Sequence, residues 1–168
     1  MSWGVSHLLA LLLGFCLDLL LGDPHWAPHP VRAIGALIAG LEKLLRRVFP
    51  KTTGGELAAG VVLVALTLCI PTGLTALLLW GCAQVSPWLA LGVETLISYQ
   101  LLAAKSLRVE SGKVYQALKA GDLPAARRAV SMIVGRDTDR LDEAGVAKAA
   151  VETVAENASD GVIAPLLF

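Results

Sequence analysis

The chain has 168 residues, of which 55% are hydrophobic and 17% charged, and its formal net charge is zero. Soluble domains average about 45–50% apolar and about 25% charged residues, so this composition favours a membrane protein. The zero net charge gives no electrostatic reason to expect a nucleic-acid partner. The cysteines Cys16, Cys69 and Cys82 lack metal-binding or redox spacing, and we interpret them as small buried hydrophobic residues.

Three apolar segments, at about residues 3–21, 57–80 and 86–104, predict membrane-spanning helices. The second segment contains no charge and exceeds the roughly 20 residues that a span needs. Pro71 predicts a kink there, which membrane helices tolerate. The short link 81–85 predicts that the second and third segments form a helical hairpin. A secretory signal is the alternative for residues 1–21, although they lack a basic start and a small-x-small cleavage site.

The positive charges indicate how these spans are oriented. All 14 Lys and Arg residues lie in two regions, 22–56 and 105–160. A hairpin between the regions places both on one side of the membrane, and an excess of Lys and Arg marks the cytoplasmic side. The sequence therefore predicts a multi-pass protein of the cell inner (plasma) membrane, with its N-terminus outside and both basic regions in the cytoplasm.

Residues 30–49 predict an amphipathic helix. Pro30 suits the first position of a helix, and apolar residues then recur at spacings of three and four. Arg32, Lys43, Arg46 and Arg47 fall on the opposite face. This pattern is typical of a helix lying in the membrane interface. Packing against the cytoplasmic region is the alternative.

The second basic region, 105–160, predicts three helices, the first of which continues from the third apolar segment. Gly and Asp residues supply their end and cap signals. The expected limits are Gly121 for the end of the first, Asp122 and Gly135 for the second, and Asp137 or Thr138 to about Asn157 for the third. The predicted fold class is all-α: one membrane domain over 1–168, with multi-pass helices and a cytoplasmic helical subdomain.

The third of these helices carries a candidate metal site. Lys148, Glu152 and Glu156 are four residues apart and therefore share one face. Asn157 lies on the adjacent row, and Asp160 follows just past the expected end. The oxygen ligands of Glu156 and Asp160 suit Mg²⁺, which takes one or two carboxylates together with substrate phosphates. A solvated helix face is the alternative.

The segment GRDTDRLDE, residues 135–143, is a candidate anion site. Arg136 and Arg140 could clamp a phosphate through bidentate hydrogen bonds. Asp137 or Asp139 could cap the following helix. Helix capping explains either aspartate but not the two arginines.

The segment GDPHWAPHPVR, residues 22–32, contains three prolines that stiffen a turn after the first span. Asp23, His29 and Arg32 are expected at the same membrane face as the later polar motifs. A rigid interfacial corner anchored by Trp26 is the alternative.

Two carboxylates lie within the apolar segments, where they are costly and point to function. Asp18 is close enough to the interface to extend toward water. Glu94 lies deeper and is expected to face another helix or a cavity. His7 is interpreted as a tolerated polar residue near the outer face.

The chain lacks the common nucleotide-binding and hydrolase motifs GxxxxGK[ST], GxGxxG and GxSxG. Two of its motifs resemble those of the CobD/CbiB family: GDPHWAPHPVRAIG (22–35) and VGRDTDRLDEAGVAKAAVETVAENASDGVIAPLLF (134–168). Members of that family are polytopic membrane proteins of cobalamin biosynthesis, regarded as adenosylcobinamide-phosphate synthases. Because family members are longer, we expect these 168 residues to be an N-terminal portion.

The resemblance implies ATP-dependent amide formation between a propionate of cobyric acid and aminopropanol or its phosphate, with Mg²⁺ as cofactor. It implies catalytic roles for Glu152, Glu156, Asn157 and Asp160, with Glu156 and Asp160 as metal ligands. The substrate-binding residues would be Asp23, His29, Arg32, Arg136 and Arg140. Association with itself or with other corrinoid-pathway membrane proteins is left open. The alternatives are an AmpE-like membrane scaffold or signalling protein, a transporter fragment and an inactive remnant of the ligase.

Overall fold

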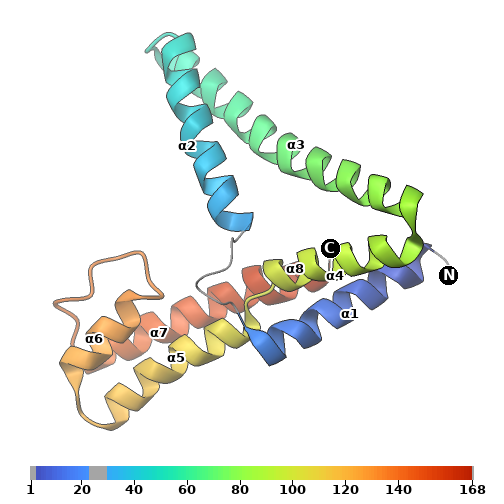
Figure 1. Cartoon of the computed structure of the whole chain (residues 1–168). Helices are drawn as coiled ribbons and strands as arrows, with labels where there is room; N and C mark the ends of the chain where they lie inside the picture. The colour runs from blue at the N-terminus through green and yellow to red at the C-terminus, as the bar shows by residue number, and fades with distance from the viewer. Residues whose placement is uncertain (1–2, 23–29, 168) are drawn as a thin grey trace. The chain divides into compact units, whose positions relative to one another are not determined.

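The computed structural model describes residues 3–22 and 30–167, and every regular element within those ranges is a helix (Figure 1). The all-α prediction is therefore confirmed for the described residues. Asp23 and His29 of the predicted substrate site lie outside them. In chain order the elements are α1 (Trp3–Leu21), α2 (Pro30–Val48), α3 (Thr53–Val85), α4 (Pro87–Leu101), α5 (Ala104–Lys119), α6 (Leu123–Ser131), α7 (Glu143–Ala158), the π-helical turn η1 (Ser159–Ile163) and α8 (Ala164–Leu167).

Two of these helices, α1 and α3, are long and apolar enough to cross a membrane. The bounds of α1 agree with the predicted segment 3–21. The 33-residue α3 is longer than the predicted 57–80, because Thr52 caps it early and it continues through Pro71 to Val85. Gly55 is its only buried residue. Cys16 and Cys69 are exposed, so the interpretation of the cysteines as buried residues is wrong for these two.

The third predicted span differs from the structure. The expected link 81–85 is helical, and Ser86 alone separates α3 from α4. Helix α4 has 15 residues and ends at Leu101, so the prediction of one helix over 86–104 that continues into the next region is wrong. The physical reason is a cap from elsewhere in the chain: the Asp18 side chain accepts hydrogen bonds from the first backbone amides of α5.

The chain divides into two compact units, and the first comprises Met1–Ala10 and Trp26–Ile97. In this unit α2 ends at Val48, one residue before the end of the predicted amphipathic helix 30–49, and it packs against α3. Leu45 is its buried residue, whereas Val31 and Val48 at its two ends stay exposed. A close turn joins the two helices, in which the Thr52 hydroxyl accepts a hydrogen bond from the Gly55 amide at 3.2 Å.

The second unit comprises Leu11–His25 and Ser98–Phe168. Helices α5, α6 and α7 pack against one another (Figure 1). Their shared core consists of the buried side chains of Val114, Ala126, Val130, Val146 and Ala149. Three helices were predicted in this region, and the structure has three α-helices there.

The residues predicted to end α5 and to begin α6 do so in the structure. Gly121 takes a positive φ of 70° after α5, a conformation that suits glycine. Asp122 then caps α6, accepting a hydrogen bond from the Ala125 amide at 2.9 Å. Helix α6 ends at Ser131, earlier than the predicted Gly135.

The start of α7 was predicted too early. It begins at Glu143, and its cap is Asp142, whose carboxylate accepts a hydrogen bond from the Gly145 amide at 2.7 Å. Asp137 accepts a hydrogen bond from the Asp139 amide at 3.0 Å within the preceding loop. Neither Asp137 nor Asp139 caps the helix, so that interpretation is wrong.

Candidate functional site

The acidic row predicted on one helix face is present on α7. Asp142 caps this helix, and its Ala- and Val-rich inner face is buried through Val146 and Ala149. The row that carries Lys148, Glu152 and Glu156 therefore stays outside the core. The Lys148 ammonium lies 3.7 Å from a carboxylate oxygen of Glu152.

The loop between α6 and α7 holds Arg136 against this row. Thr138 is 3% exposed, and its hydroxyl donates a hydrogen bond to the Arg127 carbonyl at 3.2 Å. The Arg127 side chain in turn donates to the Leu141 carbonyl at 2.7 Å. With the loop tied to α6 in this way, the Arg136 guanidinium reaches a carboxylate oxygen of Glu152 at 3.1 Å. The structure thus brings together one residue from each of two predicted sites.

Glu156, Asn157 and Arg140 are exposed. None of the three has a side-chain hydrogen bond or ion pair with a residue in 3–22 or 30–167. Their polar groups are therefore available to a ligand. Of the two arginines in the predicted anion site, Arg136 contacts the acidic row through Glu152, whereas the exposed Arg140 makes no side-chain contact of this kind with the described residues.

Asp160 lies just past the end of α7, as predicted, but the chain there continues as the π-helical turn η1. A π turn makes i→i+5 hydrogen bonds and often occurs at functional sites. Its wider winding breaks the four-residue register, so Asp160 does not simply extend the row of Glu152 and Glu156. The Gly161 carbonyl in this turn accepts a hydrogen bond from the Ala103 amide at 3.3 Å.

The break between α4 and α5 also contacts the end of α1. Asp18 is fully buried, and one of its carboxylate oxygens accepts hydrogen bonds from the amides of Ala104 at 2.9 Å and Lys105 at 3.2 Å. The Lys105 ammonium donates to the Leu20 carbonyl at 2.5 Å. The alternative that Asp18 extends toward water does not hold in the structure, because its buried carboxylate caps α5 instead.

Gly22, which opens the GDPHWAPHP segment, lies at this same junction. Its φ is 69°, and its carbonyl accepts a hydrogen bond from the Tyr99 hydroxyl at 2.5 Å. Sequence reasoning missed Tyr99 and Lys105 as parts of the site region. The signal that could have found them is the intramembrane carboxylate of Asp18, which needed donors from another helix.

Three other residues considered in the sequence analysis, Arg32, Glu94 and His7, lie in the first unit. Arg32 is exposed on α2 in the first unit, whereas the acidic row belongs to the second. Glu94 faces another helix, as predicted, because its carboxylate forms a hydrogen bond with the His7 ring of α1 within the first unit. His7 is therefore a partner of a carboxylate and not merely a tolerated polar residue.

The donor set can be compared with what Mg²⁺ requires. Across residues 3–22 and 30–167, no group of three or more His, Cys, Asp or Glu residues is arranged to hold a metal ion. Mg²⁺ commonly takes only one or two carboxylates and completes its shell with phosphates and water. Glu156 and Asp160 fit that smaller role in chemical type, and neither is occupied by a partner in the described structure.

These features define an all-helical protein with two membrane-length helices and a polar three-helix subdomain that carries paired acidic and basic side chains. The sequence profile of the family described as CobD/Cbib protein matches residues 11–168. The chain therefore belongs to the CobD/CbiB family.

Curated relatives agree with this membership. The chain is 50% identical over 158 residues to the cobalamin biosynthesis protein CobD of Pelobacter propionicus, a match covering 94% of this chain and 48% of that protein. The Geobacter metallireducens protein of the same name is 52% identical over 157 residues, with the same two coverages. That of Clostridium perfringens is 42% identical over 161 residues, covering 96% of this chain and 50% of the relative. The chain thus spans about half the length of these relatives. No solved structure matches the chain.

Proposed function

We propose that this chain acts in cobalamin biosynthesis as part of a membrane-bound enzyme that forms an amide on a corrinoid. The single observation that carries the proposal is the Arg136–Glu152 contact, which joins the anion-binding and acidic motifs within the segment matched by the family. An exposed pair of this kind contributes little to stability. The pair instead places a guanidinium, which can bind phosphate, beside carboxylates, which can bind Mg²⁺.

We place α1 and α3 across the cell inner membrane, because their apolar side chains are not covered by the rest of the chain. The end of α1 and the start of α5 lie together through Asp18, so the chain between them must return to the side from which it left. We assign that side to the cytoplasm from the positive-inside rule, with 22–56 and 105–160 there and the N-terminus outside.

The return crossing is assigned to α4. At 1.5 Å per residue its 15 residues give about 22 Å, short of the roughly 30 Å of a typical hydrocarbon core. A bilayer accommodates a short helix by local thinning at a modest cost. Reporter fusions near residues 50 and 125 should therefore both report the cytoplasm.

The proposed reaction is ligation of aminopropanol, or its phosphate, to cobyric acid. A carboxylate is a poor electrophile; transfer of the ATP γ-phosphoryl group to it gives an acyl phosphate and ADP. The amine then attacks the acyl carbon, the amide bond forms, and phosphate leaves. Arg136 and Arg140 would bind the transferring phosphoryl group and neutralise its charge.

The acidic residues of the same site would bind the metal ion and orient its ligands. Glu156 and Asp160 would hold Mg²⁺, which when bound supplies positive charge at the phosphates. Glu152 and Asn157 would orient this cluster through hydrogen bonds. Asp23, His29 and Arg32 are proposed to border the corrinoid or aminopropanol.

Ligand binding to the reconstituted chain tests the proposal. The chain is placed in nanodiscs and titrated calorimetrically with Mg²⁺–ATP and with cobyric acid. We expect both to bind, and Glu156→Gln and Asp160→Asn to weaken Mg²⁺–ATP binding. Glu143→Gln, in the first turn of α7, is the matched control and should bind normally.

Absence of Mg²⁺–ATP binding to the unaltered chain would reject the enzymatic proposal for this portion and favour the scaffold alternative. Equal binding by Glu156→Gln, Asp160→Asn and Glu143→Gln would reject the metal-site assignment alone.

A further inference from the structure

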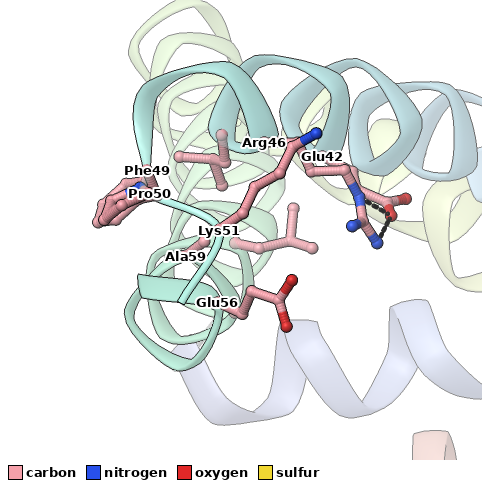
Figure 2. Close-up of a pocket in the computed structure, with 10 residues that line it drawn as sticks. Glu42, Arg46, Phe49, Pro50, Lys51, Glu56 and Ala59 are labelled. Atoms are coloured by element: carbon pink, nitrogen blue, oxygen red, sulfur yellow. Dashed lines mark hydrogen bonds and ion pairs between the residues drawn. The ribbon is translucent and has the colours of Figure 1, made fainter. Parts of the chain in front are cut away.

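A pocket of about 510 Å³ lies between the end of α2 and the start of α3, within the first unit (Figure 2). The acidic row of α7 belongs to the second unit, and the proposed ligation uses none of the residues that line this pocket. The residues lining it are Glu42, Leu45, Arg46, Phe49, Pro50, Lys51, Glu56, Ala59, Gly60 and Leu63.

Two of the four charged residues in this pocket neutralise each other. The Arg46 guanidinium makes contacts of 2.8 Å with a carboxylate oxygen of Glu42, as the dashed lines of Figure 2 show. Lys51 and Glu56 have no ion-pair partner among the residues that the structure describes. The pocket therefore offers one ammonium group and one carboxylate to a ligand, from the turn and from α3 respectively.

The rest of the lining is apolar. Leu45 is 7% exposed, and Phe49, Ala59 and Leu63 add hydrocarbon beside the two charges. The apolar surface continues along α3, where Leu57 and Val61 are both more than half exposed. A matching ligand has a dipolar head, with separated positive and negative charge, and a hydrocarbon tail.

We propose that this pocket binds the phosphoethanolamine headgroup of a zwitterionic membrane phospholipid. The Lys51 ammonium binds the phosphate, the lipid ammonium donates hydrogen bonds to the Glu56 carboxylate, and the acyl chains lie along α3. A purely anionic headgroup would leave Glu56 without a cation. A choline headgroup has no N–H to donate. The inference rests on the proposed membrane placement of α3 and not on the ligase chemistry.

Lipid retention by the purified chain tests the site. The chain in detergent is mixed with phosphatidylethanolamine, phosphatidylglycerol or phosphatidylcholine of identical acyl chains, and bound lipid is counted by native mass spectrometry. The variants are Lys51→Gln, Lys51→Arg and Glu56→Gln. Matched controls are Lys43→Gln, which is exposed on α2 but does not line the pocket, and Glu143→Gln on α7. Circular dichroism confirms that each variant is helical.

We expect phosphatidylethanolamine to be retained best. Lys51→Gln should lower its retention roughly two- to fivefold, the size expected for a partly exposed charge pair, and Lys51→Arg should restore it. Glu56→Gln should abolish the preference for ethanolamine over choline headgroups. The two controls should behave as the unaltered chain.

Three results would overturn the proposal: equal retention of the three lipids, a preference for phosphatidylglycerol, or equal losses in the pocket variants and the controls. Binding of soluble phosphoethanolamine as tight as that of the lipid would also overturn it, by assigning the site to a free aminoalkyl phosphate. Alkaline extraction of the chain from membranes distinguishes failure of the proposed membrane placement from failure of the proposed lipid pocket. Release of the chain would reject its membrane placement, whereas retention without lipid preference would reject the pocket alone.

Discussion

Asp18 accepts a hydrogen bond from the backbone amide of Ala104 at 2.9 Å, across 86 residues of sequence. This contact caps α5 with a side chain from α1 and fixes where the polar subdomain begins. It also holds the end of α1 beside the π-helical turn, because Ala103, one residue earlier, donates to Gly161. A single buried carboxylate therefore links three segments of the second unit.

Replacing Asp18 should loosen this junction. Asp18→Ala leaves the half-buried Ala104 and Lys105 amides without their acceptor, which should cost about 1–3 kcal/mol of unfolding free energy. Asp18→Asn retains an acceptor oxygen and should cost less. Thermal or denaturant unfolding in detergent, followed by circular dichroism, measures the difference. Asp139→Ala, at an exposed loop position, is the control; an Asp18→Ala cost no larger than the control's would contradict the capping role.

Replacing the neighbouring residues Gly54 and Gly55 by alanine should have different effects on stability. A Cβ on Gly55 would collide with the Pro50 carbonyl in the turn before α3, whereas a Cβ on Gly54 would meet nothing within 4 Å. Gly55→Ala should therefore destabilise the α2–α3 turn by about 1–3 kcal/mol, the usual cost of overpacking. Gly54→Ala should be neutral or slightly stabilising, since alanine favours helix. Unfolding midpoints of the two variants check this, and equal midpoints would show that the turn adjusts freely.

Two valines of α7 test the subdomain core in the same way. Val146 is fully buried and Val151 is 69% exposed. Val146→Ala should lower the unfolding free energy by about 1.5–3 kcal/mol, and Val151→Ala should change it little in detergent. Hydrogen exchange of the α5 and α6 amides gives a local measurement. Faster exchange after Val151→Ala than after Val146→Ala would mean that the core is misassigned.

Much of this architecture was predictable because its signals are local. Hydropathy gave α1 and most of α3, and the Gly121–Asp122 pair marked the boundary between α5 and α6. The failures depend on long-range contacts. The LLAAKS segment contains no proline or glycine to end α4, and its break is set by Asp18. Likewise, Asp137 and Asp139 are as good caps as Asp142 by residue type, but Thr138 is buried against α6 and keeps them in the loop.

The sequence indicated which residue types the candidate site contains, but it indicated less about how those residues are arranged. Four-residue spacing placed Glu152 and Glu156 on one face of α7 correctly. The four-residue spacing does not predict the π turn, in which the Gly161 carbonyl accepts a hydrogen bond from the distant Ala103 amide. The positions of Asp160 and of the arginines relative to the row therefore needed the structure.

The Arg136–Glu152 contact gives the sharpest functional prediction. The two side chains are 54% and 50% exposed, so a double-mutant cycle should measure a coupling of only about 0.2–1 kcal/mol, decreasing at high salt. Such weak pairing leaves the guanidinium free to exchange Glu152 for a phosphate.

We therefore expect Arg136→Ala to weaken Mg²⁺–ATP binding roughly tenfold, the size of a lost charge-assisted hydrogen bond, while the unfolding free energy changes little. Arg128→Ala, an exposed arginine on α6, is the control in the same calorimetric titration. A strong coupling to Glu152 with no difference between the two variants in ATP affinity would identify the contact as structural and remove Arg136 from the anion site.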